Sequence, residues 1–280
     1  MKELDFFLAE SSSFYDDKKY KQGLEFALKA LEIDSTSLVG HLLSALNYFE
    51  LKKMKEALHH FELAKHEAKS SPQAMSSYAV TLSENQRGQD ALNMFKEITE
   101  LYPDYTPVSY NYGRCLMLNK KHAEAIPWLD KAETESNMPY GVLHDRGTCW
   151  YFLNEYDKAE KDLQKLIDIK PDYTHASLLL AHISMKKGLW DKAIEHTSRL
   201  LYFKPEHADA LKLRFQSRLQ QKDKNGNIFN RKGAQEDADR MMALNISFVH
   251  VKTTDNKKYK IVKVNIGPKG EVNVMVDPIK

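Results

Sequence analysis

The stretch Y140-G-V-L-H-D-R-G-T-C-W-Y-F-L-N-E-Y-D-K-A-E-K-D-L-Q-K-L-I-D-I-K-P-D-Y173 decides the fold of this chain. Two amphipathic segments lie within it, and a turn around Asn154 joins them. Gly147 and Ala159 are small residues at which the two helices can touch, and Pro171 ends the second helix. The stretch therefore predicts a helix-turn-helix unit.

The same layout recurs every 34 residues without a gap, in the units 4–37, 38–71, 72–105, 106–139, 140–173 and 174–207. Position 8 of these units holds Ser11, Ala45, Ala79, Gly113, Gly147 and Ala181. Position 20 holds Gly23, Ala57, Ala91, Ala125, Ala159 and Ala193. Small side chains at every one of these positions allow paired helices to approach closely. The chain is thus expected to be a repeat scaffold.

This arrangement resembles the tetratricopeptide repeat (TPR) family, whose 34-residue helix-turn-helix carries small residues at positions 8 and 20. The resemblance covers residues 4–207. It implies an all-α, right-handed superhelical solenoid of about seven TPR repeats. The chain departs from the family at position 4, where Trp is frequent, and here the residues are Phe7, His41, Met75, Ser109, Leu143 and Ser177. Proline is also missing from position 32 in three units, which carry Ser35, Lys69 and Asn137.

Proline positions suggest where two helices begin. Ser71-Pro72 and Thr106-Pro107 each place a side chain able to cap a helix before a proline in the first turn. Pro127 falls inside the second helix of its unit, and we expect it to kink that helix or delay its start.

The regular pattern ends after residue 207. Residues 208–246 are interpreted as a degenerate seventh or capping repeat, in which a seven-residue insertion would align Ala234 with position 20. From Ser247 the apolar period changes to two, which predicts a small antiparallel β meander over 247–280 with strands at 248–252, 259–266 and 272–276. Because a sheet of about thirty residues buries little surface by itself, it must pack on the last helices, on a partner or on another copy.

The composition is that of a globular protein, and the low net charge gives no strong overall electrostatic field. The formal net charge is +2, although residues 248–280 carry seven lysines against three acidic residues. No apolar run reaches the length of a membrane span, and acidic residues interrupt the segment in which a signal peptide needs an apolar core. Cys115 and Cys149 occupy equivalent repeat positions, about 8–10 Å apart on stacked helices, which is too far for a disulfide. We therefore expect a cytoplasmic location, with no nucleic-acid or membrane partner.

No catalytic motif is complete. His66-Glu67-Ala68-Lys69-Ser70 lacks the second histidine of a zinc-protease motif, and the loop beginning at Asp223 lacks the glycine that a calcium loop needs at its sixth position. His144, His175 and His182 share a predicted surface, where contact with solvent or peptide is favoured over a metal site. The sequence predicts no enzyme, no cofactor and no metal.

In the family, the first helix of each repeat lines an inner groove through positions 2, 5, 9, 12 and 13. The apolar and polar candidates at these positions are Leu42, Leu46, Phe49, Tyr110, Arg114, Met117, His144, Tyr151, Phe152, Leu178, His182, Met185 and Lys186. Exposed apolar surface of this extent marks a binding site. The alternatives are a slipped register or a groove closed by tight curvature.

We therefore expect a protein–protein interaction scaffold whose ligand is a peptide or protein segment held in the concave groove. Arg114, His144, His182 and Lys186 would select acidic or carbonyl-rich groups of that ligand. The alternative is an assembly or autoinhibition module, in which the C-terminal meander mediates self-association or folds back toward the groove.

Overall fold

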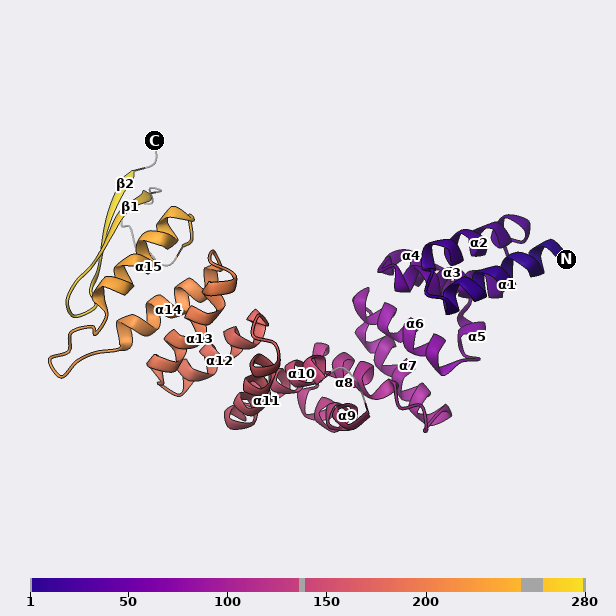
Figure 1. Cartoon of the computed structure of the whole chain (residues 1–280), viewed down its shortest axis with the longest axis horizontal. Helices are drawn as coiled ribbons and strands as arrows, with labels where there is room; N and C mark the ends of the chain where they lie inside the picture. Colours follow the sequence, from indigo (N-terminus) through magenta and orange to yellow (C-terminus); the bar gives the residue numbers. More distant parts are fainter. Residues whose placement is uncertain (1, 136–138, 248–258, 279–280) are drawn as a thin grey trace. The chain divides into compact units, whose positions relative to one another are not determined.

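A computed structural model describes residues 2–135, 139–247 and 259–278 (Figure 1). These residues divide into two compact units, the first ending at Asp145 and the second beginning at Arg146. Unit 1 contains the helices α1 (Lys2–Asp16), α2 (Tyr20–Ile33), α3 (Leu38–Glu50), α4 (Met54–Leu63), α5 (Lys65–Ala68), α6 (Pro72–Glu84), α7 (Gly88–Leu101), α8 (Val108–Leu118), α9 (His122–Glu135) and the first half of α10 (Pro139–Phe152). Within this unit the first helices of successive repeats touch, because α1 contacts α3, α3 contacts α6 and α6 contacts α8. They form its inner layer.

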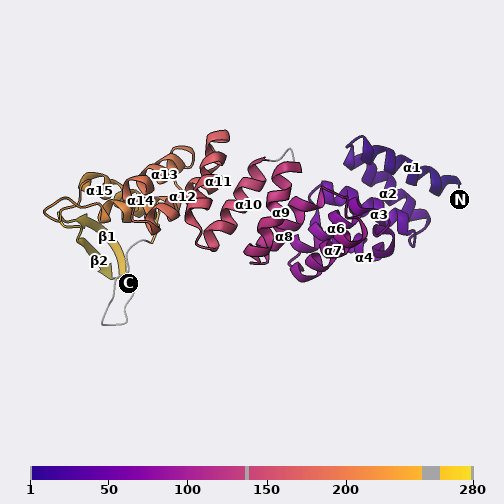
Figure 2. The same cartoon turned by 90° about the horizontal axis from the view of Figure 1, so that it is seen from below.

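Unit 2 continues the alternation from the second half of α10. Its helices are α11 (Tyr156–Ile169), α12 (Thr174–Lys186), α13 (Trp190–Phe203), α14 (Ala208–Gln220) and α15 (Arg231–Ala243), and its strands are β1 (Tyr259–Ile266) and β2 (Val272–Pro278). Helices α11 to α14 pack as successive neighbours, and α12 also contacts α14 (Figure 2). The helical-repeat fold expected from the 34-residue period is confirmed in both units.

The turn inside each repeat has one residue in the left-handed conformation. These residues are spaced by 34 and are Lys18, Lys52, Gln86, Lys120, Asn154 and Gly188, with φ between 60° and 70°. At Lys52, the amide of this residue donates to the carbonyl of Phe49, and the next amide donates to the carbonyl of Tyr48. This pair of hydrogen bonds is the Schellman motif, which satisfies carbonyls at the end of the first helix.

Close approach of the paired helices follows from the small residues. A Cβ atom added at Gly147 would lie 2.9 Å from Cγ of Leu163, so no larger residue fits without a shift. In the first repeat, the hydroxyl of Ser11 donates to the carbonyl of Gly23 at 2.8 Å, which joins positions 8 and 20 directly. Both cysteines are buried, and they are not joined by a disulfide.

The expected helix starts are confirmed only in part. The hydroxyl of Ser71 accepts a hydrogen bond from the amide of Ala74 with proline in the first turn, as predicted. The prediction for Thr106 was wrong, because α8 begins at Val108 and its preceding residue, Pro107, has no capping side chain. Pro127 lies inside α9, which still begins at His122, so the proline does not delay the helix. Pro127 is the sixth residue of α9, beyond the amides that lack an intrahelical partner, so the helix loses one hydrogen bond, to the carbonyl of Ala123.

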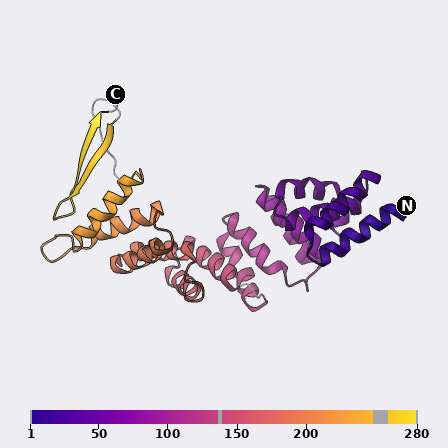
Figure 3. The same ribbon diagram turned by 45° about the horizontal axis from the view of Figure 1, so that its top comes forward.

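The C-terminal strands form an antiparallel hairpin that lies beside α15 (Figure 3). The strands expected at 259–266 and 272–276 are present, whereas the one expected at 248–252 lies outside the described residues. Val264 and Ile266 are buried against a cluster built from α13, α14 and α15 that includes Phe215, Ala238 and Met241. The hairpin therefore extends the core of the last helices.

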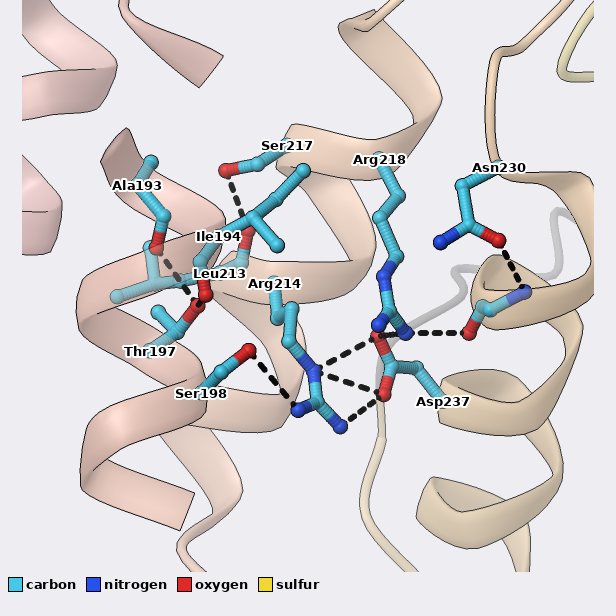
Figure 4. Close-up of polar contacts among 11 residues, drawn as sticks. Ala193, Ile194, Thr197, Ser198, Leu213, Arg214, Ser217, Arg218, Asn230 and Asp237 are labelled. Atoms are coloured by element: carbon cyan, nitrogen blue, oxygen red, sulfur yellow. Dashed lines mark hydrogen bonds and ion pairs between the residues drawn. The ribbon is translucent and has the colours of Figure 1, made fainter. Parts of the chain in front are cut away.

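A buried ion-pair network joins the last two helices (Figure 4). Asp237 is 1% exposed and accepts hydrogen bonds from Arg214 at 2.6 Å and from Arg218 at 2.7 Å. Arg214 also donates to the hydroxyl of Ser198 on α13. Arg218 also donates to the carbonyl of Gly233. Three helices are thus held together around one carboxylate.

We predict that Gly188→Ala lowers stability by about 1 kcal/mol, because an alanine side chain is disfavoured in the left-handed conformation. The position has open space around it, so the cost is that of the backbone alone. Lys120→Ala is the matched control, since a side chain already occupies the same conformation there, and its change should stay within about 0.5 kcal/mol. Urea unfolding measures both, and equal midpoints for the two variants would contradict the explanation.

We also predict that Asp237→Asn destabilises the protein by about 3 kcal/mol, because two partly buried guanidinium groups lose their counter-charge. The exposed neighbour Glu236→Gln serves as control and should change stability by less than about 0.5 kcal/mol. Thermal unfolding followed by circular dichroism compares them. If Asp237→Asn loses no more stability than the control, the network contributes no net stability.

Candidate ligand-binding groove

The inner wall of unit 1 starts on α3. Leu42, Leu46 and Phe49 are half-buried and share one face of this helix, because their spacing is four and three residues. The ammonium group of Lys52 lies 5.3 Å from the centre of the Phe49 ring. This face combines half-buried apolar side chains with one aromatic ring that a lysine approaches.

A pocket of about 130 Å³ lies between the inner helices α6 and α8. It is lined by Val80, Ser83, Glu84, Phe95, Tyr110, Asn111, Arg114, Cys115 and Leu118. It adjoins a second, more open hollow of about 400 Å³ that shares Ser83, Glu84, Arg114 and Leu118. A cavity of about 150 Å³ can hold benzene. The pocket thus has room for one apolar side chain of a ligand.

A polar cluster borders this pocket. Arg114 Nη1 donates to both carboxylate oxygens of Asp145, at 3.1 Å and 3.3 Å. His144 Nδ1 lies 2.9 Å from the same carboxylate, which is fully buried. Burial and the negative charge of Asp145 raise the pKa of the Tyr110 hydroxyl to about 12, so this group stays protonated at neutral pH. The carboxylate thus ties together three residues from α8 and α10.

This geometry corrects the role expected for Arg114 and His144. Neither is an uncompensated cation that waits for an acidic ligand, since both contact Asp145. The Arg114 side chain nevertheless remains 42% exposed. A guanidinium has five N–H donors, Asp145 engages one nitrogen and the Tyr110 hydroxyl also bonds the group, so the remaining donors can face a ligand.

The inner wall of unit 2 is built from α10 and α12. Phe152 is 57% exposed and meets Tyr151 edge-on at 5.4 Å between ring centres. His182 is half-buried, and burial lowers its pKa, so its imidazole is neutral at pH 7. Lys186 is exposed, whereas Leu178 packs partly against the C-terminal cluster. Met185 is half-buried on the same helix.

The structure differs at Met117 and Asp145 from the groove residues that the repeat positions predict. Met117 is 8% exposed and packs beneath the wall of unit 1, so it supports the groove instead of lining it. Asp145 was missed, because position 6 does not belong to the groove set of the family. The signal was available, since an acidic residue at an inward position demands a nearby cation. Leu118 has 51% of its surface exposed and is the most open apolar residue of the pocket.

The described residues contain no group of three or more His, Cys, Asp or Glu side chains arranged to hold a metal ion. In the same part of the chain, every helix falls short of the length and apolarity that crossing a bilayer requires.

Comparison with known proteins agrees with the repeat pattern. A family model described as tetratricopeptide repeat matches residues 82–136 and 153–216. BBSome complex member BBS4 of Bos taurus is 29% identical over 124 residues, which are 44% of this chain and 24% of that protein. The DnaJ homolog subfamily C member 7 homolog of Schizosaccharomyces pombe is 24% identical over 235 residues, 82% of this chain and 45% of that protein. The chain spans less than half the length of either relative.

Solved structures show the same fold at low sequence identity. Pseudomonas aeruginosa pilF is 19% identical with a TM-score of 0.59, and the match covers 77% of this chain and 98% of that chain. YrrB, described as a TPR protein with an unusual peptide-binding site, is 22% identical with a TM-score of 0.51, covering 61% of this chain and 88% of that chain. These similarities establish a helical-repeat architecture and nothing about the ligand.

A histidine pair in unit 1 makes the stability of the fold depend on pH. Nδ1 of His60 lies 2.9 Å from Nδ1 of His41, and its ring stacks on Tyr48 at 5.4 Å. Burial, together with His41 and His59, lowers the pKa of His60 from 6.5 to about 4. The unfolded chain therefore binds a proton more readily than the folded one between these values. Stability is full above pH 6.5 and decreases as the pH falls toward 4.

We predict that stability falls by about 2 kcal/mol over this interval because of His60, after allowance for its partial exposure. Urea unfolding of wild type, His60→Gln and His66→Gln at several pH values tests this. The His60 variant should lose that part of the slope, while the variant of the exposed His66 should keep it. Identical slopes in all three proteins would contradict the assignment.

Proposed function

Because the chain belongs to the tetratricopeptide repeat family, we propose that it is an interaction scaffold that binds a peptide or protein segment along its inner helices. The observation that carries the proposal is that apolar side chains are exposed on inner helices of both units. Leu118 is 51% exposed beside the pocket of unit 1, and Phe152 is 57% exposed in unit 2. Contacts of this kind supply affinity when a partner covers them.

The pocket of unit 1 suggests what the ligand offers. Its apolar part suits one aliphatic or aromatic side chain, and the remaining donors of Arg114 suit a main-chain carbonyl. Glu84 lines the same pocket and disfavours an acidic group beside it. A neutral extended or helical segment with an apolar anchor therefore fits unit 1 best. In unit 2, the exposed Lys186 adds a preference for carbonyl or acidic groups.

The relatives support the broader statement. BBS4 is named as a member of a protein complex, and YrrB is described by its peptide-binding site. We infer that this chain likewise works by holding other proteins together, without chemistry of its own. Assembly through the C-terminal strands is a second candidate, favoured over autoinhibition because the apolar face of the hairpin already packs on α15.

A selection from a displayed peptide library tests groove binding, because the protein itself selects the peptides that it binds. We expect peptides enriched on the wild-type protein to bind Leu118→Ser or Phe152→Ser at least about tenfold more weakly, since each variant removes an exposed apolar anchor. Fluorescence anisotropy with the enriched peptides measures the affinities.

Each variant has a matched control in its own unit. Leu101→Ser and Tyr202→Ser change residues that are 56% and 79% exposed on the second helices α7 and α13. These variants should bind like wild type. If the controls weaken binding as much as the inner-wall variants, or if no variant weakens it, the groove proposal fails.

A further inference from the structure

The two strands of the hairpin have different edges. On β1, the outward backbone groups are taken by side chains of α15. The amide of Gln235 donates to the carbonyl of Val264 at 2.8 Å, and its oxygen accepts from the amide of Ile266 at 3.0 Å. Arg231 donates to the carbonyl of Ile266 at 2.6 Å. The edge of β1 is therefore blocked at these residues against another strand.

The edge of β2 is open within the described residues. Pairing of Asn265 with Asn273 and of Lys263 with Met275 directs the backbone of Asn273 and Met275 toward β1. By alternation, the amides and carbonyls of Val272 and Val274 point to the other side. No protein group among residues 2–135, 139–247 and 259–278 bonds to them.

The first five residues of β2 lack the usual protection of an open edge, and a charge and a proline occur only at its last two residues, Asp277 and Pro278. Natural edge strands carry charged residues, above all lysine, or proline. Residues 272–276 are V-N-V-M-V, without charge or proline, whereas Lys263 lies on the covered strand. On the outer face of the hairpin, Asn273 is exposed and Met275 is 59% exposed. An uncharged, largely apolar strand of this kind is suited to pair with another strand along its open edge.

We propose that β2 pairs antiparallel with β2 of a second copy of this chain, about a twofold axis at Val274, to form a four-stranded sheet. The register is self-complementary. Val274 meets its own counterpart on the face that packs on α15, and Asn273 lies opposite Met275 of the partner subunit on the outer face. No like charges are opposed in these pairs.

Charge also permits this arrangement. In the four-stranded sheet, Lys263 and its counterpart are separated by three strand spacings, or about 14 Å. That distance exceeds the screening length of about 8 Å at physiological ionic strength. The lysines of β1 would hinder pairing at the β1 edge but not at the β2 edge. The pairing does not depend on the groove, so either proposal can fail alone.

A charge-register experiment tests the pairing with the full chain. Asn273→Lys with Met275→Lys places lysine opposite lysine twice across the twofold axis. Asn273→Glu with Met275→Lys, the Lys/Glu variant, uses the same exposed positions but places lysine opposite glutamate twice, and both variants keep the same lysine opposite Lys263 of β1. Sedimentation velocity from about 1 to 300 µM measures the dimer dissociation constant of each protein.

We expect wild type and the Lys/Glu variant to dimerise within this range, and the Lys/Lys variant to dimerise at least about tenfold more weakly than the Lys/Glu variant. Val274→Pro is an independent variant, because it removes the outward amide and leaves the β1 ladder in place. It should be monomeric while the Ile266 amide, which bonds to Gln235, stays protected from hydrogen exchange.

Three results would overturn the proposal. A wild-type protein that stays monomeric over the whole range would mean that no second copy covers the edge. Equal dissociation constants for the Lys/Lys and Lys/Glu variants would place the interface elsewhere. Dimerisation of Val274→Pro with wild-type affinity would show that the outward backbone of β2 is not used.

Discussion

The structure depends on how closely the two helices of each repeat approach one another. At Gly147 the distance is so short that a methyl group would collide with Leu163, and at Ser11 the side chain bonds directly to the facing backbone. Such an approach requires a tight turn, which the left-handed residue at position 15 supplies in each of the six regular repeats. Once the helix pair is fixed, the inner faces of the first helices are fixed as well. The groove that we propose along these helices would follow from this packing.

One pair of facing positions in the repeat is occupied by different kinds of side chain in different repeats. Position 7 faces position 23, and the pair is Tyr112 with Trp128 at 4.8 Å between ring centres in the fourth repeat. In the fifth repeat it is Arg146 with Asp162, joined by two hydrogen bonds of 2.8 Å. Arg214 and Asp237 reproduce this ion pair across the loop after α14. Because Arg214 and Asp237 occupy the same two positions once the insertion is allowed for, they support the proposal that residues 208–246 are a seventh repeat. The inserted residues lie in the loop between α14 and α15 and do not disturb the contact between these helices.

Periodicity predicted the helices, the close contacts and the final hairpin, because these follow from residues within one 34-residue unit or one strand pair. It did not predict the start of α8, since Thr106 lies in a turn whose course is set by Tyr102 and Tyr105, not by a capping side chain. The identity of the partner of Asp145 was equally out of reach, because Arg114 lies 31 residues before it on a neighbouring repeat. Features that join two repeats need the packing of both.

The Arg114–Asp145 pair also limits the ligands that fit the binding mode we propose for unit 1. Asp145 is fully buried, and a carboxylate in that position without a cation would be costly. A ligand carboxylate that drew Arg114 away would have to offset this loss, so it would gain little from the new ion pair. A main-chain carbonyl makes no such demand, because it uses guanidinium donors that the buried carboxylate leaves open. In the binding mode that we propose, Arg114 therefore contacts the main chain of the ligand, and the apolar pocket beside it selects the side chain.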